Sequence, residues 1–444
     1  MKRLEKGQNN KAISPRAMTL IASTALALTT PVAAMVAPAS AQDVAEEAEK
    51  TFATVVVTAR KREESLLDIS GSVQVLDDDL LDDFNLDEVD LVIDLVPNAT
   101  FNAAPSGTPV IAIRGLGTRP GSAMLEQDVG LFVDGVWLGR NNQLNSALVD
   151  VAQIEVLKGT QATLYGRNTL AGAVSVQTKK PGKDFEGYVN AGYEFEHDSQ
   201  YVEGAVTVPL SERLSVRLAS KYEDEGGYVR NTVLNREEAE SENVTVRGTA
   251  VYDGDSGLEL IGRLQFTDRE RTGNVFIREE QSVGVTEPFE FTPSPFPAPV
   301  LVGYDENALG RQITVPVIDL PDVGSDIEFL DWSFTAEMPV GDLTLTSITA
   351  GSSMDLESVF DVFLSSPPGP RVIGYFDEDY DQFTQEVRLT SPSDGNFQYI
   401  VGAFYLDQSV DRLTYQYVNT ADRFWSGEQD VSSWAVFASG TYSL

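Results

Sequence analysis

The second half of this sequence is divided into runs of roughly ten residues in which apolar and polar side chains alternate. In the run at 213–222, Leu214, Val216 and Leu218 share one face, and Ser215 and Arg217 share the other. Because successive side chains of a β-strand point to opposite sides, this alternation gives a strand one apolar face. It gives a helix no such face. The ten runs are 186–195, 200–209, 213–222, 243–252, 257–267, 327–338, 342–352, 379–391, 396–408 and 430–442.

The connections between these runs alternate in length. The even-numbered ones are short, at 210–212, 253–256, 339–341 and 392–395. Apart from the tight first hairpin at 196–199, the odd-numbered ones are long, including 223–242 and 268–326. Short turns on one side and long loops on the other are typical of transmembrane barrels. We therefore expect residues 183–444 to form antiparallel transmembrane β-barrel strands.

The N-terminus has the pattern of a signal peptide. Basic residues precede the apolar run 17–28, and Ala39-Ser40-Ala41 supplies small residues where a signal peptidase cuts. We expect cleavage before Gln42, so that residues 1–41 are removed. The alternative is an uncleaved membrane helix over 17–37, which the threonines and prolines at 29–31 disfavour.

Composition narrows the classes of function. The sequence has no cysteine and one histidine, His197, so disulfides, thiolate metal sites and histidine-based catalysis have little support. A net charge of −36 would repel nucleic acid. Calcium binding by the acidic residues is an alternative, but their spacing matches no EF-hand loop. Because we find no catalytic constellation and no metal-ligand spacing, we expect no enzyme, no cofactor and no metal site.

Residues 66–182 are expected to form a separate domain of mixed α/β type, preceded by a tail at 42–65. It opens with a short strand and amphipathic helices over 76–97, followed by strands at 110–115 and 129–136. The segment 154–176 has a strand pattern at each end and glycine at turn positions between them.

Four motifs in order resemble the energy-coupling box and plug motifs of the TonB-dependent outer-membrane receptors. They are Thr54-Val55-Val56-Val57-Thr58-Ala59, Ile113-Arg114-Gly115, Val133-Asp134-Gly135 and the segment 154–176. The resemblance implies a plug inside a 22-stranded barrel in the outer membrane of a Gram-negative bacterium. It also implies energy-coupled uptake of a scarce ligand, with TonB, membrane lipid and the ligand as partners and a monomer when full length. We expect a ferric siderophore as the ligand; the alternatives are a carbohydrate or other small organic nutrient, or a passive plugged porin.

The box at 54–59 is short, β-branched and flanked by charged segments. We expect it to stay extended and unpaired, so that TonB adds to it as a strand through Thr54, Val55, Val56, Val57, Thr58 and Ala59. The alternative is a first plug strand folded into the domain.

A second expected set of residues locks the plug to the barrel. Alternation places Glu386 in the lumen, where a buried carboxylate needs a cationic partner. Similar receptors pair plug arginines with barrel glutamates, which assigns Arg114 and Lys158 as the plug partners of Glu386. Lysine at 158 lacks the two-pronged geometry of arginine.

Ligand contacts are expected in two plug turns, at Arg119 and at Trp137, Arg140 and Asn142. These side chains could hold an anionic ferric siderophore through charge-assisted hydrogen bonds. A sugar, or packing within the plug, remains an alternative. Haem is disfavoured because the one histidine lies in an expected hairpin tip.

Size sets a further expectation. Ten strands enclose a radius of roughly 10 Å, whereas the plug has a radius of gyration near ~14 Å and 22 strands give roughly 22 Å. We therefore expect about ten of the 22 strands here and a barrel incomplete at the C-terminus. With the same number of residues per strand, a full receptor would have about 750 residues.

Overall fold

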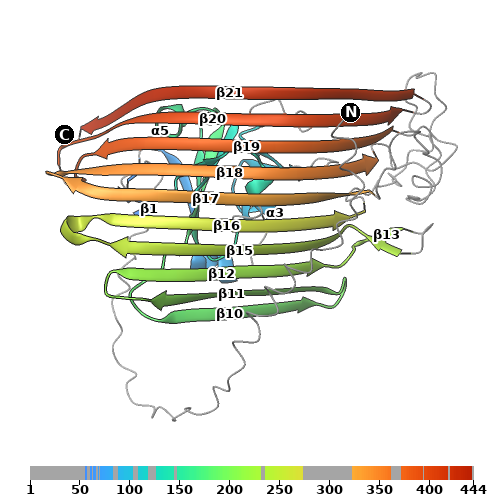
Figure 1. Cartoon of the computed structure of the whole chain (residues 1–444), viewed down its shortest axis with the longest axis horizontal. Coiled ribbons are helices and arrows are strands. Elements are labelled where there is room, and N and C mark those ends of the chain that lie inside the picture. The colour runs from blue at the N-terminus through green and yellow to red at the C-terminus, as the bar shows by residue number, and fades with distance from the viewer. Residues whose placement is uncertain are drawn as a thin grey trace, which may run out of the picture. The chain divides into compact units, whose positions relative to one another are not determined.

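The computed structural model describes residues 56–442 with gaps, and residues 1–55, which include the expected signal peptide, lie outside it (Figure 1). The gaps are 58–60, 63, 67–68, 70, 84–88, 104–108, 119–126, 145–147, 232–235, 274–322, 362–371, 394 and 419–420. None of the helices among the described residues is long and apolar enough to cross a membrane.

Ten strands form one antiparallel sheet in chain order, as the alternating runs predict (Figure 1). Each strand pairs with the next in this sheet, and β10 and β21 lie at its two edges. The strands are β10 (Glu186–Glu194), β11 (Ser199–Pro209), β12 (Leu214–Glu225), β15 (Glu240–Asp253), β16 (Glu259–Thr272), β17 (Gly324–Val340), β18 (Leu343–Asp361), β19 (Val372–Thr390), β20 (Phe397–Val418) and β21 (Ala421–Tyr442). The 3₁₀ turn η2 (Asp255–Gly257) joins β15 to β16.

The later strands are longer than the sequence pattern predicts. The expected loop between β20 and β21, at 409–429, is wrong: both strands continue, and only residues 419–420 separate them. Threonine, valine and aromatic residues persist through this stretch, and these residue types favour a strand even where strict alternation weakens. The expected loop at 223–242 contains a further two-stranded sheet of β13 (Val229–Asn231) and β14 (Arg236–Glu238).

The two faces of the sheet differ in polarity, as expected. On β17, Leu330, Trp332 and Phe334 point to one side and are exposed, whereas Asp331 and Ser333 point to the other and are half-buried. An apolar exposed face is what a barrel presents to lipid. The polar and buried face is therefore the inner wall.

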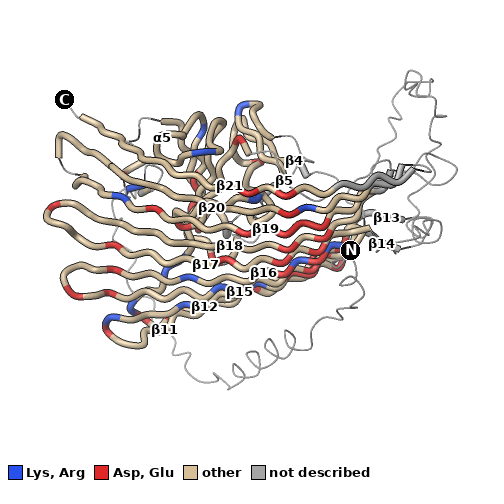
Figure 2. Tube along the Cα trace, turned by 45° about the horizontal axis from the view of Figure 1, so that its top comes forward, with Lys and Arg blue, Asp and Glu red and all other residues tan. Residues whose placement is uncertain are grey.

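At one end of the sheet, the outward face carries acidic residues in place of apolar ones. Figure 2 shows this band of Asp and Glu crossing several strands. The strand register sets its members directly opposite one another in two rows, Asp224–Glu242–Glu270–Asp326–Glu357–Asp377 and Asp268–Glu328–Asp355–Asp379–Asp411. Like charges directly opposite across strands repel each other. We call these the acidic rows.

The preceding domain has the expected mixed α/β structure. Its five-stranded sheet has the order β3-β8-β9-β6-β7, and β4 and β5 form a separate pair. A core of buried aliphatic side chains, including Leu131, Ile154 and Val176, holds these elements together. The elements are β3 (Ser72–Asp77), α2 (Asp78–Asp83), α3 (Val89–Asp94), β4 (Ala99–Ala103), β5 (Pro109–Ile113), β6 (Val129–Val133), β7 (Val136–Leu138), β8 (Val151–Lys158), α5 (Ala162–Tyr165) and β9 (Gly172–Thr178).

Candidate functional site

Glu386 lies on the inner wall, as alternation predicts, and it has a cationic partner from the plug side. That partner is Lys61: its Nζ donates to Glu386 Oε2 at 2.5 Å, and both side chains are less than 10% exposed. Arg388 donates to the other oxygen at 2.9 Å. Burial lowers the pKa of Lys61, and the charge of Glu386 acts against that shift.

The structure does not bring Arg114 and Lys158 to Glu386. Lys158 Nζ donates to Gln74 Oε1 at 3.4 Å and to the Pro97 carbonyl at 3.2 Å, both within the plug. Arg114 is exposed, in a turn with φ of 54°. The cation that pairs with Glu386 is therefore Lys61 of the tail, and not the plug residues Arg114 and Lys158 that the resemblance implied. Lys61 lies in the seam between the plug and the inner wall.

A second ion pair across this seam has the opposite polarity. Asp150 of the plug accepts two hydrogen bonds from Arg217 of β12, with Nε–Oδ2 and Nη2–Oδ1 both at 2.6 Å. Arg247 of β15 donates to the Val149 carbonyl at 2.5 Å. Glu203 of β11 accepts from the Asp150 N–H at 3.0 Å. Three barrel strands thus hold one short plug segment.

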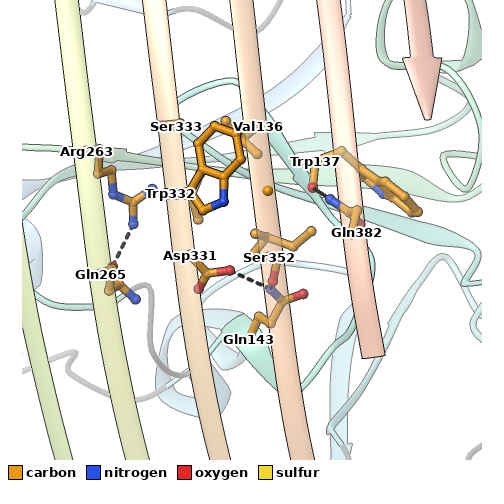
Figure 3. Close-up of a pocket in the computed structure, with 13 residues that line it drawn as sticks. Val136, Trp137, Gln143, Arg263, Gln265, Asp331, Trp332, Ser333, Ser352 and Gln382 are labelled. Atoms are coloured by element: carbon orange, nitrogen blue, oxygen red, sulfur yellow. Dashed lines mark hydrogen bonds between the residues drawn. The ribbon is translucent and has the colours of Figure 1, made fainter. Parts of the chain in front are cut away.

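A third contact region lies where the plug segment 137–143 meets β17 to β19 (Figure 3). Gln382 donates to the Trp137 carbonyl at 2.9 Å. Gln143 donates to Asp331 at 2.9 Å and to Ser352 at 2.7 Å. A cavity of about 20 Å³ lies among these groups, which is room for about one water molecule.

Glycine is required at 139 for this docking. A Cβ atom at Gly139 would lie 1.8 Å from the Tyr380 hydroxyl oxygen. Tyr380 is itself fixed, because its hydroxyl donates to Gln382 at 2.5 Å. The plug backbone therefore lies directly on the barrel wall at this position.

Two arginines share one glutamate beside this glycine. Arg140 of the plug contacts Glu378 Oε1 at 3.0 Å, and Arg412 of β20 donates to Glu378 Oε2 at 3.1 Å. The guanidinium of Arg412 lies 3.7 Å from the centre of the Phe376 ring, and that of Arg140 lies 4.8 Å from the Tyr380 ring. Each cation thus contacts both a carboxylate oxygen and an aromatic face.

The residues expected to contact ligand lie mainly in this seam. Trp137 is 5% exposed and Asn142 is 9% exposed. Arg140 is held by Glu378, and Arg119 lies outside the described residues. The plug turn at 137–142 thus packs against the inner wall.

The box at 54–59 is described only at β1 (Val56–Val57), and there it is not unpaired. Val56 pairs with Ser65 and Val57 with Glu64 of β2 (Glu64–Ser65). Val57 is fully buried, in a cluster with Tyr165, Ile400 and Leu406. The expectation of an unpaired segment is wrong for these two residues, because Glu64 and Ser65 of the same chain supply an antiparallel partner strand. Thr54, Val55, Thr58 and Ala59 lie outside the described residues.

Among the described residues, no three carboxylate or imidazole side chains are grouped so as to hold a metal ion. A folded domain docked on the polar face of a ten-stranded antiparallel sheet is the arrangement of a plug against part of a barrel wall.

Comparison with known proteins finds a match to the plug domain and a likeness to several receptors. Residues 65–173 match the family model of the TonB-dependent Receptor Plug Domain. The pesticin receptor of Yersinia pestis is 30% identical over 154 residues, which are 33% of this chain and 22% of that protein. The iron-regulated outer membrane virulence protein of Vibrio cholerae serotype O1 is 27% identical over 201 residues, which are 40% of this chain and 29% of that protein.

Among solved structures, the ferric yersiniabactin uptake receptor from Yersinia pestis superposes with a TM-score of 0.67 at 17% identity. The match covers 84% of this chain and 54% of that one, so the chain spans about half the length of this receptor. The chain thus resembles TonB-dependent outer-membrane receptors, with a matching plug domain followed by ten barrel strands.

Proposed function

We propose that this protein takes up an iron chelate, a ferric siderophore, across the outer membrane in a TonB-driven cycle. The observation that supports the proposal is the docking of the plug on the inner wall at Arg140, by Glu378, and at Asp150, by Arg217. A lumen filled in this way blocks passive flow, so a solute passes only after work is done on the plug.

The choice of an iron chelate rests on the relatives. The matched proteins include an iron-regulated outer membrane virulence protein and a ferric yersiniabactin uptake receptor. The seam offers cationic groups of a kind that would suit the oxygen ligands of a ferric complex, in Arg140 and Arg412. We propose that Arg119, Trp137, Arg140 and Asn142 contribute ligand contacts once the turn is free of the wall.

We propose that TonB binds at 54–59. The β1–β2 pair supports this proposal, because Val56 and Val57 already have a strand partner that TonB would replace. Lys61 and Glu386 form the plug–barrel lock nearest to the box.

The test is uptake of ⁵⁵Fe-labelled ferric siderophores by cells that carry or lack the gene, each with and without tonB. Gene-dependent uptake that also requires tonB is expected. Uptake that persists without tonB would indicate a passive plugged porin. Gene-dependent growth on a carbohydrate, with no iron uptake, would indicate the nutrient alternative.

A further inference from the structure

We infer that Arg388 and Arg412, two arginines of the barrel wall, are positioning residues for the release of the plug. Each keeps a wall glutamate paired when the plug-side cation that shares this glutamate withdraws. The inference rests on the proposed function in one respect, namely that the plug leaves the inner wall during the cycle. It concerns how the docking contacts come apart and involves no contact with the ligand.

The first observation is the division of Glu386 between the plug side and the wall. Lys61 of the tail donates to Oε2 at 2.5 Å, and Arg388 donates to Oε1 at 2.9 Å. Arg388 follows Glu386 by two residues on β19, so both side chains point to the same face of the sheet. When Lys61 leaves, Glu386 therefore retains a cation that belongs to its own strand.

Glu378 is divided in the same way. Its Oε1 contacts Arg140 of the plug at 3.0 Å, and its Oε2 accepts from Arg412 at 3.1 Å. Glu378 on β19 and Arg412 on β20 are directly opposite in the strand register, and the guanidinium of Arg412 lies 3.7 Å from the centre of the Phe376 ring. Arg412 is thus fixed to the wall by two contacts and does not leave with the plug.

A third ion pair across the seam shows the same pattern with the charges reversed. Arg217 of β12 holds Asp150 of the plug with Nε and Nη2, and its Nη1 contacts Glu186 of β10 at 3.2 Å. The wall partner is again distinct from the plug partner. Three buried ions on the wall thus each have one partner that can depart and one that stays.

The physical reason for this pattern is the cost of an unpaired buried charge. The side chains of Glu386 and Glu378 are 7% and 4% exposed, so water would solvate them poorly if the plug-side cation were their sole partner. The wall arginine also repels that cation. Burial lowers the pKa of Lys61 most, and the positive charge of Arg388 lowers it further. The wall arginine therefore weakens the hold on the docked cation and stabilises the released wall, and both effects ease release.

The experiment uses the full receptor, expressed from its own gene and purified from outer membranes, without TonB or siderophore. Hydrogen exchange is followed by mass spectrometry in two peptides, one covering β1 and β2 and one covering residues 139–144. The first peptide reports release of Lys61 from Glu386. The second reports release of Arg140, because backbone N–H groups donate to carbonyls within this turn.

Arg388→Gln should slow exchange of the β1–β2 peptide by at least about threefold and leave the peptide at 139–144 unchanged. Arg412→Gln should do the reverse, so that each variant is the matched control of the other. Lys61→Met removes the plug-side cation itself and should speed exchange of the β1–β2 peptide. Arg388→Lys keeps the wall charge and should exchange like wild type.

A purely structural role predicts the opposite sign, because loss of an arginine that only packs the wall would loosen the plug and speed exchange. Unchanged or faster exchange of the β1–β2 peptide in Arg388→Gln would therefore overturn the inference, as would slowing that Arg388→Lys reproduces or slowing of both peptides by one variant. If Arg388→Gln is not recovered in the membrane, Arg412→Gln decides by the same criterion at 139–144. No arm involves iron or TonB, so an absence of iron uptake contradicts the proposed function alone.

Discussion

Arg217 of the barrel holds Asp150 of the plug with two hydrogen bonds of 2.6 Å, and both side chains are at most 5% exposed. This pair fixes the plug immediately before β8. Its charges are reversed relative to the expected lock, in which the barrel supplies the carboxylate. Lys61 and Glu386 have the expected polarity, but their cation comes from the tail.

Asp150→Asn should destabilise the docked plug by up to about 3–5 kcal/mol, because it removes the buried carboxylate that holds Arg217 with two hydrogen bonds and leaves that guanidinium only the exposed Glu186 at 3.2 Å as a charged partner. Thermal unfolding and hydrogen exchange of the plug amides would measure this loss. The control is Asp255→Asn, which breaks the two-pronged pair with Arg213 at an exposed turn and should leave the unfolding midpoint unchanged. Equal effects of the two substitutions would contradict the role of Asp150.

Val56→Pro should abolish energised uptake while ligand affinity stays within a few-fold. Proline removes a backbone N–H and fixes φ, which blocks strand addition at β1. Uptake by energised cells and binding to energy-depleted cells separate the two effects. Val56→Ala retains the N–H and should transport normally; uptake by the proline variant would place the TonB-binding segment elsewhere.

Lys61 should make the stability of the plug depend on alkaline pH. Burial lowers its pKa below the ordinary value of 10.5, so above the lowered pKa the folded state binds fewer protons than the unfolded chain. The free energy of unfolding should therefore increase as the pH rises from the lowered pKa to 10.5. Lowering the pH through the same range should remove that gain. Thermal unfolding of wild type and Lys61→Met across this range gives the contribution by difference, and parallel curves would refute it.

Asp326→Asn should stabilise the sheet by roughly 0.2–1 kcal/mol at low salt, because Asp326 is directly opposite both Glu270 and Glu357. The gain should shrink as salt screens the acidic rows. Asp381→Asn is the matched control, since its cross-strand neighbours are Ser353 and Ser409. A gain of the same size at Asp381, or one independent of salt, would show that cross-strand repulsion is not its cause.

The sequence predicts the ten strands, their order and their inward and outward faces, because burial on one face imposes a period of two. It does not predict how far β20 and β21 extend, since nothing in alternation distinguishes a strand in lipid from one continuing into water. The contacts between plug and barrel were likewise predicted only in part. Alternation places Glu386 on the inner wall, but the choice of Lys61 depends on the antiparallel pairing of β1 with β2, and the sequence between them has no turn signal such as glycine or proline.

Asp150 was missed for a similar reason. It adopts a positive φ of 52°, as aspartate does more readily than most residues, and a single aspartate after a valine is an ordinary turn residue in sequence. Its function depends on Arg217, 67 residues away. Of the four expected ligand contacts, Trp137, Arg140 and Asn142 converge on one seam, but only the structure shows that Glu378 and Arg412 lie beside them.

The acidic rows also set how deep the sheet sits. On β17 the outward side chains change from Glu328 to Leu330 within one step of two residues, about 7 Å along the strand. Carboxylates do not enter hydrocarbon, and Trp332 and Phe334 would lose contact with it if the sheet rose. The step from Glu328 to Leu330 therefore marks the edge of the hydrocarbon layer on β17. Any movement of the sheet along the membrane normal would carry carboxylates into the hydrocarbon or aromatic side chains out of it.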